Sequence, residues 1–134
     1  FTAQQKQIAM RDFRKYDVYH DAIEFAISIY KTTGSFPDAE KFNLVSQLQR
    51  AAVSISANVA EGAGRSTSKD FARFISQSLG SANECETLLV IASRLNLVAD
   101  LELNHLIEDL QSIQKRLAGL RKTLLSSNTS NKYH

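Results

Sequence analysis

The stretch LELNHLIEDLQSIQKRLAGLRKTLL, residues 101–125, decides the fold class. Its apolar residues recur at alternating intervals of three and four, which predicts a helix that packs along its whole length as coiled-coil helices do. This apolar seam consists of Leu103, Leu106, Leu110, Ile113, Leu117, Leu120 and Leu124. A helix with such a seam must bury it against other helices, so the sequence predicts a helical bundle.

Composition and pattern extend this prediction to the whole chain. Its 134 residues are 43% hydrophobic and 22% charged, which is typical of one soluble domain. One proline, five glycines and no tryptophan leave few helix breaks and disfavour a β-sandwich or barrel. Three further amphipathic segments with short connections complete the pattern. We therefore expect a single all-α domain, an up-down-up-down antiparallel four-helix bundle with helices at about 14–33, 40–61, 67–95 and 101–125 and a polar tail at 126–134.

Local signals set the expected helix boundaries. Gly34 is expected at the C′ position of the first helix, and Pro37 lies in the loop that follows. Gly62 is expected to terminate the second helix. Thr67 and Asp70 have the spacing of a capping box, which predicts the start of the third helix.

The first helix carries two adjacent apolar stripes instead of one. The second stripe consists of Tyr19, Ile23, Ile27 and Tyr30. A helix on the outside of a monomeric bundle usually shows a wider polar face. We therefore expect something besides the bundle core to cover part of this helix.

A line of polar residues follows the second helix at intervals of three and four. Its members are Gln47, Arg50, Ser54, Asn58 and Glu61, and Arg65 follows just past the helix end. Ser and Asn are poor formers of helix interiors and usually make hydrogen bonds there. If hidden without partners, each would cost about 1–3 kcal/mol. We expect them to bond across to the third helix, with Asn83 and Glu84 as candidate partners, and a partly solvated face is the alternative.

The third helix contains a matching feature at Gly80, Ser81 and Ala82. A glycine in a helix interior costs about 1 kcal/mol relative to alanine. The best explanation for Gly80 is the close approach of another backbone. That backbone belongs either to the second helix or to a neighbouring chain.

These two segments resemble the bacterial four-helix-bundle family first noticed in intervening sequences of 23S ribosomal RNA genes. The resemblance covers the two central helices closely and the outer two by pattern. It rests on Gln47, Arg50, Ala51, Ser54, Ile55, Asn58, Val59, Ala60, Glu61, Gly62, Phe71, Phe74, Gly80, Ser81 and Glu84. The departures are Ser56, where the family often has proline, and Val59, where it more often has isoleucine.

The resemblance implies a ring-like homopentamer with a poorly defined general role. Related proteins include the accessory variability determinant of diversity-generating retroelements, which binds nucleic acid and a reverse transcriptase. We accordingly expect a non-catalytic oligomeric scaffold or adaptor. Its expected partners are RNA, DNA or a nucleic-acid-processing enzyme that resembles a reverse transcriptase.

The net charge is too small to indicate nucleic-acid binding by itself. It is +2 per chain, or about +10 if five chains combine. Candidate contacts are the basic residues near the two ends of the chain: Arg11, Arg14, Lys15, Lys115, Arg116, Arg121 and Lys122. Cations in the last turn of a helix also complement the helix dipole, which is the alternative explanation for the second group.

The sequence offers little for catalysis or for a bound cofactor. Cys85 has apolar neighbours and no nearby histidine, so we expect a packed side chain. Glu102 and His105 form one Glu-x-x-His motif that flanks the leucine seam, whereas di-iron bundles need two such motifs facing inward. We expect neither an enzyme nor a cofactor, and the alternative is a bundle that binds a small molecule or a metal.

The segment GAGRSTSKD, residues 62–70, resembles a phosphate loop only in part. It follows a helix and lacks the Gly-Lys-Ser/Thr ending of that motif. Anion capture at the following helix start, aided by Arg65 and Lys69, stays open.

Cysteine content and hydropathy point to the cytoplasm. Cys85 is the single cysteine, so no disulfide framework is expected. No apolar run approaches the roughly 20 residues of a membrane span, and the first residues lack the apolar core of a secretory signal. We expect no membrane association.

Overall fold

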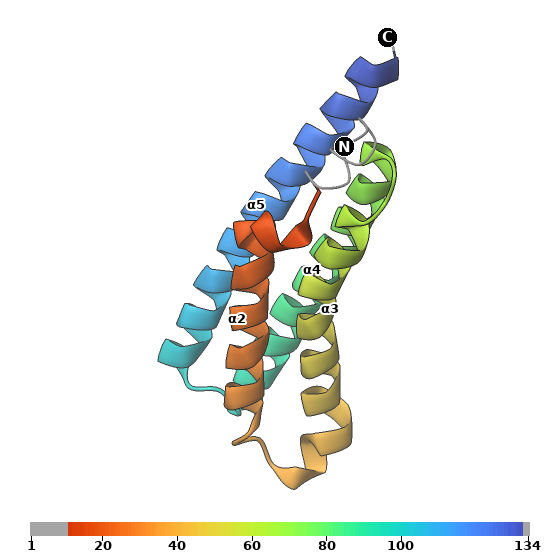
Figure 1. The fold of residues 1–134 in the computed structure, drawn as a ribbon. Coiled ribbons are helices and arrows are strands. Elements are labelled where there is room, and N and C mark those ends of the chain that lie inside the picture. Colours follow the sequence, from red (N-terminus) through yellow and green to blue (C-terminus); the bar gives the residue numbers. More distant parts are fainter. Residues whose placement is uncertain (1–10, 133–134) are drawn as a thin grey trace.

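The computed structural model describes residues 11–132, with side chains up to residue 127. The elements are a 3₁₀ turn η1 (Phe13–Lys15), helix α2 (Asp17–Thr33), a 3₁₀ turn η2 (Asp38–Glu40), a π-helical turn η3 (Lys41–Val45), α3 (Ser46–Ala63), α4 (Ser68–Arg94) and α5 (Asp100–Lys132). Successive long helices run in opposite directions, and the end of α5 projects beyond the α3–α4 connection (Figure 1). The described residues contain no strand, so the all-α four-helix bundle is confirmed.

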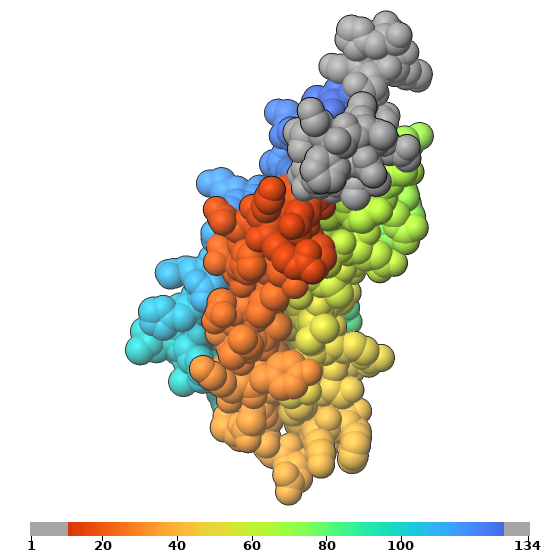
Figure 2. Space-filling model, viewed as in Figure 1, coloured from red at the N-terminus to blue at the C-terminus, as the bar shows by residue number. Residues whose placement is uncertain are grey.

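The core takes its fully buried residues from all four long helices. They are Phe25 and Ile29 of α2, Leu48 and Ile55 of α3, Phe71, Ile75 and Leu89 of α4, and Leu110, Ile113 and Leu117 of α5. The predicted seam of α5 is confirmed, since only Leu103 and Leu120 of its seven residues are half-buried. Helix α4 makes the most extensive contacts, with α3 and α5. Helix α2 forms the front surface between α5 and α3 (Figure 2).

The fourth helix, predicted to end near residue 125, instead continues to Lys132, so residues 126–132 of the predicted polar tail are helical. Neither glycine nor proline follows Leu125, and a helix that has already formed extends through weak helix formers at small cost. Residues 133–134 lie outside the described part. Elsewhere the predicted boundaries differ by a few residues, chiefly because η1 precedes α2 and η3 precedes α3.

Gly62 does not terminate α3, because the helix continues to Ala63 with Gly64 as its C-cap. A Cβ atom built on Gly62 would lie 2.7 Å from the Cβ of Phe74 and 2.8 Å from the Cδ1 of Phe71. Gly62 is therefore needed because α4 approaches α3 closely at this point. Gly34 also differs from expectation, since its φ of −60° is right-handed and the C′ prediction fails.

The two ends of α4 have well-formed caps. The Oγ1 of Thr67 accepts a hydrogen bond of 3.0 Å from the backbone N–H of Asp70, as the capping-box spacing predicts. At the other end Asn96 has φ 61°, in the left-handed region. Its N–H bonds to the carbonyl of Ser93, and the N–H of Leu97 bonds to the carbonyl of Ala92, both at 2.9 Å. This Schellman motif ends the helix.

Replacement of Asn96 by alanine is expected to destabilise the fold by about 1 kcal/mol, because a Cβ-bearing residue other than Asn or Asp is strained in the left-handed region. Asn96→Gly is the matched control and should retain or exceed wild-type stability. Urea unfolding at one fixed protein concentration measures both free energies. Equal stability of the alanine and glycine variants would contradict the assignment.

Cys85 is packed in the core as expected, with no exposed surface. Burial, with a smaller effect of the nearby Glu84 charge, raises the pKa of its thiol to about 12. The thiolate is the nucleophilic form of cysteine, and it is not populated near neutral pH at this site.

Within residues 11–132, no helix combines the length and the apolar character that crossing a bilayer requires.

Candidate nucleic-acid interface

Charge is segregated along the bundle axis. We call the side chains of residues 11–23, 54–80 and 113–127 the basic end, where α2 and α4 begin and α3 and α5 finish (Figure 1). It carries ten cations: Arg11, Arg14, Lys15, Arg65, Lys69, Arg73, Lys115, Arg116, Arg121 and Lys122. It carries five carboxylates, those of Asp12, Asp17, Asp21, Glu61 and Asp70, so its formal charge is +5.

The opposite half of the bundle has the reverse balance. We call the side chains of residues 24–53 and 81–112 the acidic end. Its nine carboxylates are Glu24, Asp38, Glu40, Glu84, Glu86, Asp100, Glu102, Glu108 and Asp109, and its four cations are Lys31, Lys41, Arg50 and Arg94. Its formal charge is therefore −5. The small net charge of the chain conceals this strong asymmetry.

An open cavity of about 490 Å³ lies in the basic end, between the start of α4 and the later part of α5. Its lining consists of Thr67, Lys69, Asp70, Ala72, Arg73, Ser76, Arg121 and Leu125. The Nη1 of Arg121 donates a long hydrogen bond of 3.4 Å to the Oγ of Ser76, which links α5 to α4 across this cavity. Cations and hydroxyls in such an arrangement suit an anionic ligand.

Two arginines beside this cavity are held in fixed positions. The guanidinium groups of Arg65 and Arg73 lie over the ring of Phe74 at 4.5 and 4.6 Å. The carboxylate of Asp70 lies 2.9 Å from Arg73 and 3.8 Å from Arg65. Arg65 also pairs with Glu61 at 3.1 Å. Stacking and ion pairing therefore preorganise both groups while part of each stays exposed to solvent.

Besides Arg121, which bonds to Ser76, three of the predicted basic contacts have partners within the chain. Arg11 donates hydrogen bonds of 2.8 Å to the carbonyl of Arg65 and to the Oγ of Ser68. Arg14 pairs with Asp12 at 3.1 Å and lies over the ring of Phe13. The third, Arg116, pairs with Asp21 of α2 at 2.6 Å. The partners of Arg11 and Arg116 come from other segments, so sequence spacing could not reveal them, whereas Arg14 pairs with Asp12 two residues away.

The remaining predicted cations are more available. Lys15, Lys115 and Lys122 are exposed and make no hydrogen bond or ion pair with the described residues. Sequence reasoning missed Arg73 and assigned Lys69 only to anion capture. The signal that could have found the pair is its spacing of four at the start of α4, which places both on one face of the helix.

The polar line of α3 is bonded to α4 at its centre. The Nδ2 of Asn58 donates to the Oγ and to the carbonyl of Ser54 at 2.9 Å. The Oγ of Ser81 on α4 donates to the Oγ of Ser54 at 2.9 Å, so the expected cross-helix bond is present. The two predicted partners, Asn83 and Glu84, do not make this bond, and Asn83 instead accepts a hydrogen bond from Gln114 of α5.

Exposure to solvent varies along the polar line of α3. Gln47, Arg50 and Glu84 line a shallow groove of about 330 Å³ together with Ala51, Ser54 and Ser81. Gln47 donates to Asn43 at 2.9 Å. Within the chain, Gln47, Ser54 and Asn58 of this line are half-buried, whereas Arg50 and Glu61 are exposed.

Gly80 does not mark a close approach of helices inside the chain. A Cβ atom added to it would meet nothing within 4 Å. The prediction that the second helix approaches closely at Gly80 is therefore wrong within the single chain. The small residue that does sit at the close approach of α3 and α4 is Gly62.

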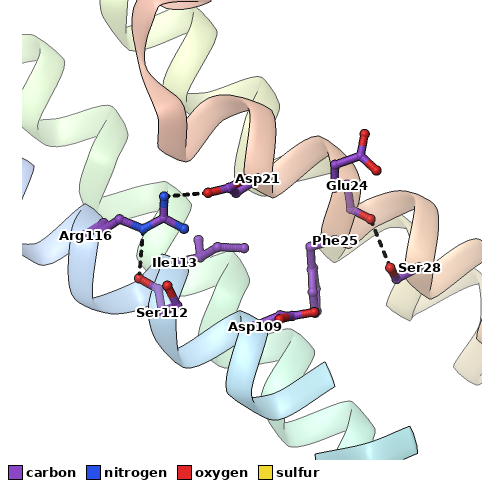
Figure 3. Close-up of a pocket in the computed structure, with 8 residues that line it drawn as sticks. All are labelled: Asp21, Glu24, Phe25, Ser28, Asp109, Ser112, Ile113 and Arg116. Carbon is purple, nitrogen blue, oxygen red and sulfur yellow. Dashed lines mark hydrogen bonds and ion pairs between the residues drawn. The ribbon is translucent and has the colours of Figure 1, made fainter. Parts of the chain in front are cut away.

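A second cavity, of about 290 Å³, lies between α2 and α5 (Figure 3). Its lining includes the carboxylates of Asp21, Glu24 and Asp109 and the guanidinium of Arg116. Arg116 bridges to Asp21 and also donates to the carbonyl of Ser112 at 3.3 Å. In the part of the chain that the structure describes, no group of three or more His, Cys, Asp or Glu residues could hold a metal ion.

The Glu-x-x-His motif does not face the bundle interior. Glu102 accepts a hydrogen bond of 2.6 Å from the Oγ1 of Thr32, and His105 is exposed. His20, on α2, bonds through Nε2 to the carbonyl of Arg14 at 2.7 Å. The described histidines thus lie on the surface.

The fold and charge distribution define a four-helix-bundle protein with one cation-rich end. A family model for the 23S rRNA-intervening sequence protein matches residues 14–119, and the chain belongs to that family. A similar solved structure is a protein of unknown function of the S23 ribosomal protein family from Bacteroides thetaiotaomicron. The two chains share 27% identity with a TM-score of 0.71, and the match covers 78% of this chain and 98% of that one. No curated protein matches.

Proposed function

We propose that this protein is a non-catalytic oligomeric scaffold or adaptor whose basic end binds nucleic acid. The observation that carries the proposal is the segregation of charge, with +5 at one end of the bundle and −5 at the other. Contacts between Lys or Arg and phosphates dominate the affinity of proteins for nucleic acids. A polyanion would therefore be attracted to the basic end and repelled by the other.

Exposed apolar side chains support the oligomeric part of the proposal. Ile27 and Tyr30 of α2, Phe42 of η3 and Val53 of α3 are 42%, 51%, 89% and 44% exposed. Tyr30, Phe42 and Val53 line one open groove between these elements. Contiguous exposed apolar surface commonly marks an interaction site. We propose that a second copy covers this surface, in a homo-oligomer for which the family resemblance suggests a pentamer.

Assembly would strengthen nucleic-acid binding if the copies are related by a rotation axis parallel to the bundles. All basic ends then lie on one face of the ring, and their fields add. The adaptor would then bring a nucleic-acid-processing enzyme, for example one that resembles a reverse transcriptase, to the bound nucleic acid. A nucleic-acid partner and a single buried thiol both suit the cytoplasm.

The described residues also favour a non-catalytic role. Burial raises the pKa of the Cys85 thiol to about 12, which opposes its use as a nucleophile. Neither His20 nor His105 lines the cavities between α4 and α5 or between α2 and α5. The function proposed here needs charge and shape alone.

Purified protein is expected to bind fluorescently labelled nucleic acid with an affinity that falls as salt rises. A plot of log association constant against log salt should be linear, with a slope of about −0.9 for each phosphate contacted on a duplex. Fluorescence anisotropy over a series of salt concentrations measures it. Absence of binding at low salt would remove the proposed function.

Phe42→Glu is expected to dissociate the oligomer while leaving each chain folded. Phe42 is 89% exposed, so its replacement removes little packing inside the chain, whereas a charge in a covered interface is costly. Light scattering after gel filtration measures the mass, and circular dichroism checks the helices. Phe42→Leu is the control and should remain assembled. An unchanged mass for Phe42→Glu would show that this surface is not the interface.

A further inference from the structure

We propose that the nucleic acid bound by the basic end is double-stranded and is recognised through its phosphates without reading of base sequence. The inference rests on the proposed function and specifies the form of the ligand. The basic end presents cations to solvent, while its aromatic rings pack against other side chains.

The aromatic rings of the basic end are engaged by other side chains. Proteins that bind single strands combine a positive groove with exposed aromatic rings, on which each unpaired base gains about 1–3 kcal/mol by stacking. Here Phe13 contacts Tyr19 edge to face, with ring centroids 5.0 Å apart. Tyr16 contacts the buried Phe71 in the same way at 5.8 Å. These rings serve the packing of α2 on the bundle.

Phe74 is likewise closed to a base. Phe74 is only 5% exposed to solvent, and the guanidinium groups of Arg65 and Arg73 lie over its ring. Because Asp70 also holds both guanidinium groups, they present N–H groups in fixed positions. Phosphate oxygens accept such hydrogen bonds well, often in pairs.

The cavity between α4 and α5 has the same character. Its lining includes Lys69, Arg73 and Arg121 together with the hydroxyls of Thr67 and Ser76, and no aromatic side chain. The cavity can therefore receive phosphate groups but gives an unpaired base nothing on which to stack.

The exposed aromatic rings lie at the wrong end for a single strand. Tyr30 and Phe42 are 51% and 89% exposed, and both belong to the acidic end with its nine carboxylates. In the basic end the exposed ring of His20 contacts Tyr19 edge to face and bonds through Nε2 to the carbonyl of Arg14, so it is engaged as the other rings of this end are. A surface of cations alone favours the duplex, which carries one charge per about 1.7 Å of axis compared with about 3.4 Å for each strand.

Binding of a labelled DNA duplex of roughly 30 base pairs, about three helical turns, should be compared with binding of one of its strands alone. The salt slopes per contact are about −0.9 for duplex and −0.7 for single strands. With equal binding at 1 M salt as the reference, about five contacts predict that the duplex binds about tenfold more tightly at 0.1 M salt. Duplexes of unrelated sequence should bind equally. The matched variant Lys69→Gln/Lys122→Gln should make the duplex slope shallower by about 1.8.

Each alternative result separates this inference from the proposed function. Tighter binding of the single strand, or a tenfold preference among duplex sequences, overturns the inference and leaves nucleic-acid binding in place. Absence of binding to both forms at low salt overturns both.

Discussion

Reversal of charge at the basic end is expected to weaken nucleic-acid binding by roughly 60-fold at 0.1 M salt. The variant is Lys69→Glu/Lys122→Glu, which changes two exposed lysines on α4 and α5. Each lost phosphate contact reduces the salt slope by about 0.9, which corresponds to roughly eightfold in affinity between 1 M and 0.1 M salt. The loss of two contacts therefore weakens binding by roughly eight times eight, or about 60-fold. Repulsion between the new carboxylates and the phosphates weakens it further. Anisotropy titrations of wild type and variant measure the change.

The matched control reverses two exposed cations of the acidic end that do not line the proposed oligomer groove. Lys31→Glu/Arg94→Glu changes the net charge of the chain by the same amount, so any effect of total charge is equal in the two variants. We expect the control to bind nearly as the wild type does. Equal loss of affinity in both variants would show that net charge, and not its position on the bundle, controls binding.

Gly62→Ala is expected to destabilise the bundle by about 2 kcal/mol. The added methyl group would lie 2.7 Å from the Cβ of Phe74, an atom fixed to the α4 backbone, so the two helices must separate. Overpacking of this kind costs about 1–3 kcal/mol and outweighs the gain in helix propensity. Urea unfolding measures the free energy, with circular dichroism as the signal.

Gly80 and Gly119 provide controls inside helices α4 and α5. A Cβ atom at either position meets nothing within 4 Å. Their replacement by alanine should stabilise the fold by about 0.5–1 kcal/mol, through helix propensity alone. If Gly62→Ala proves as stable as these variants, the close approach of α3 and α4 is not what requires glycine. Loss of assembly in Gly80→Ala would place a neighbouring chain against that residue.

The fold was predictable because its strongest signals are periodic and local. The seam from Leu103 to Leu124 identified α5 and its buried face, and the spacing of Thr67 and Asp70 identified the start of α4. Asn96 was missed, although asparagine tolerates the left-handed conformation that ends α4. Gly62 was misinterpreted as a helix end, because its conflict with Phe74 depends on how two helices pack.

The candidate site was predictable only in part. Sequence proximity grouped Arg11 and Arg116 with the free lysines, yet the structure pairs these two arginines with groups on other segments. The charge segregation was not visible along the chain either. Each helix contributes both signs, and the pattern emerges only when antiparallel packing brings α4 residues beside those at the end of α5.

Lysine footprinting tests the central claim most directly. The protein is acetylated with a limiting reagent in the presence and absence of duplex DNA, and mass spectrometry measures the modification of each lysine. We predict that the duplex protects Lys69 and Lys122 while Lys31 and Lys41 react as before. Protection of Lys31 and Lys41 with Lys69 and Lys122 unchanged would contradict the assignment of the nucleic-acid interface to the basic end.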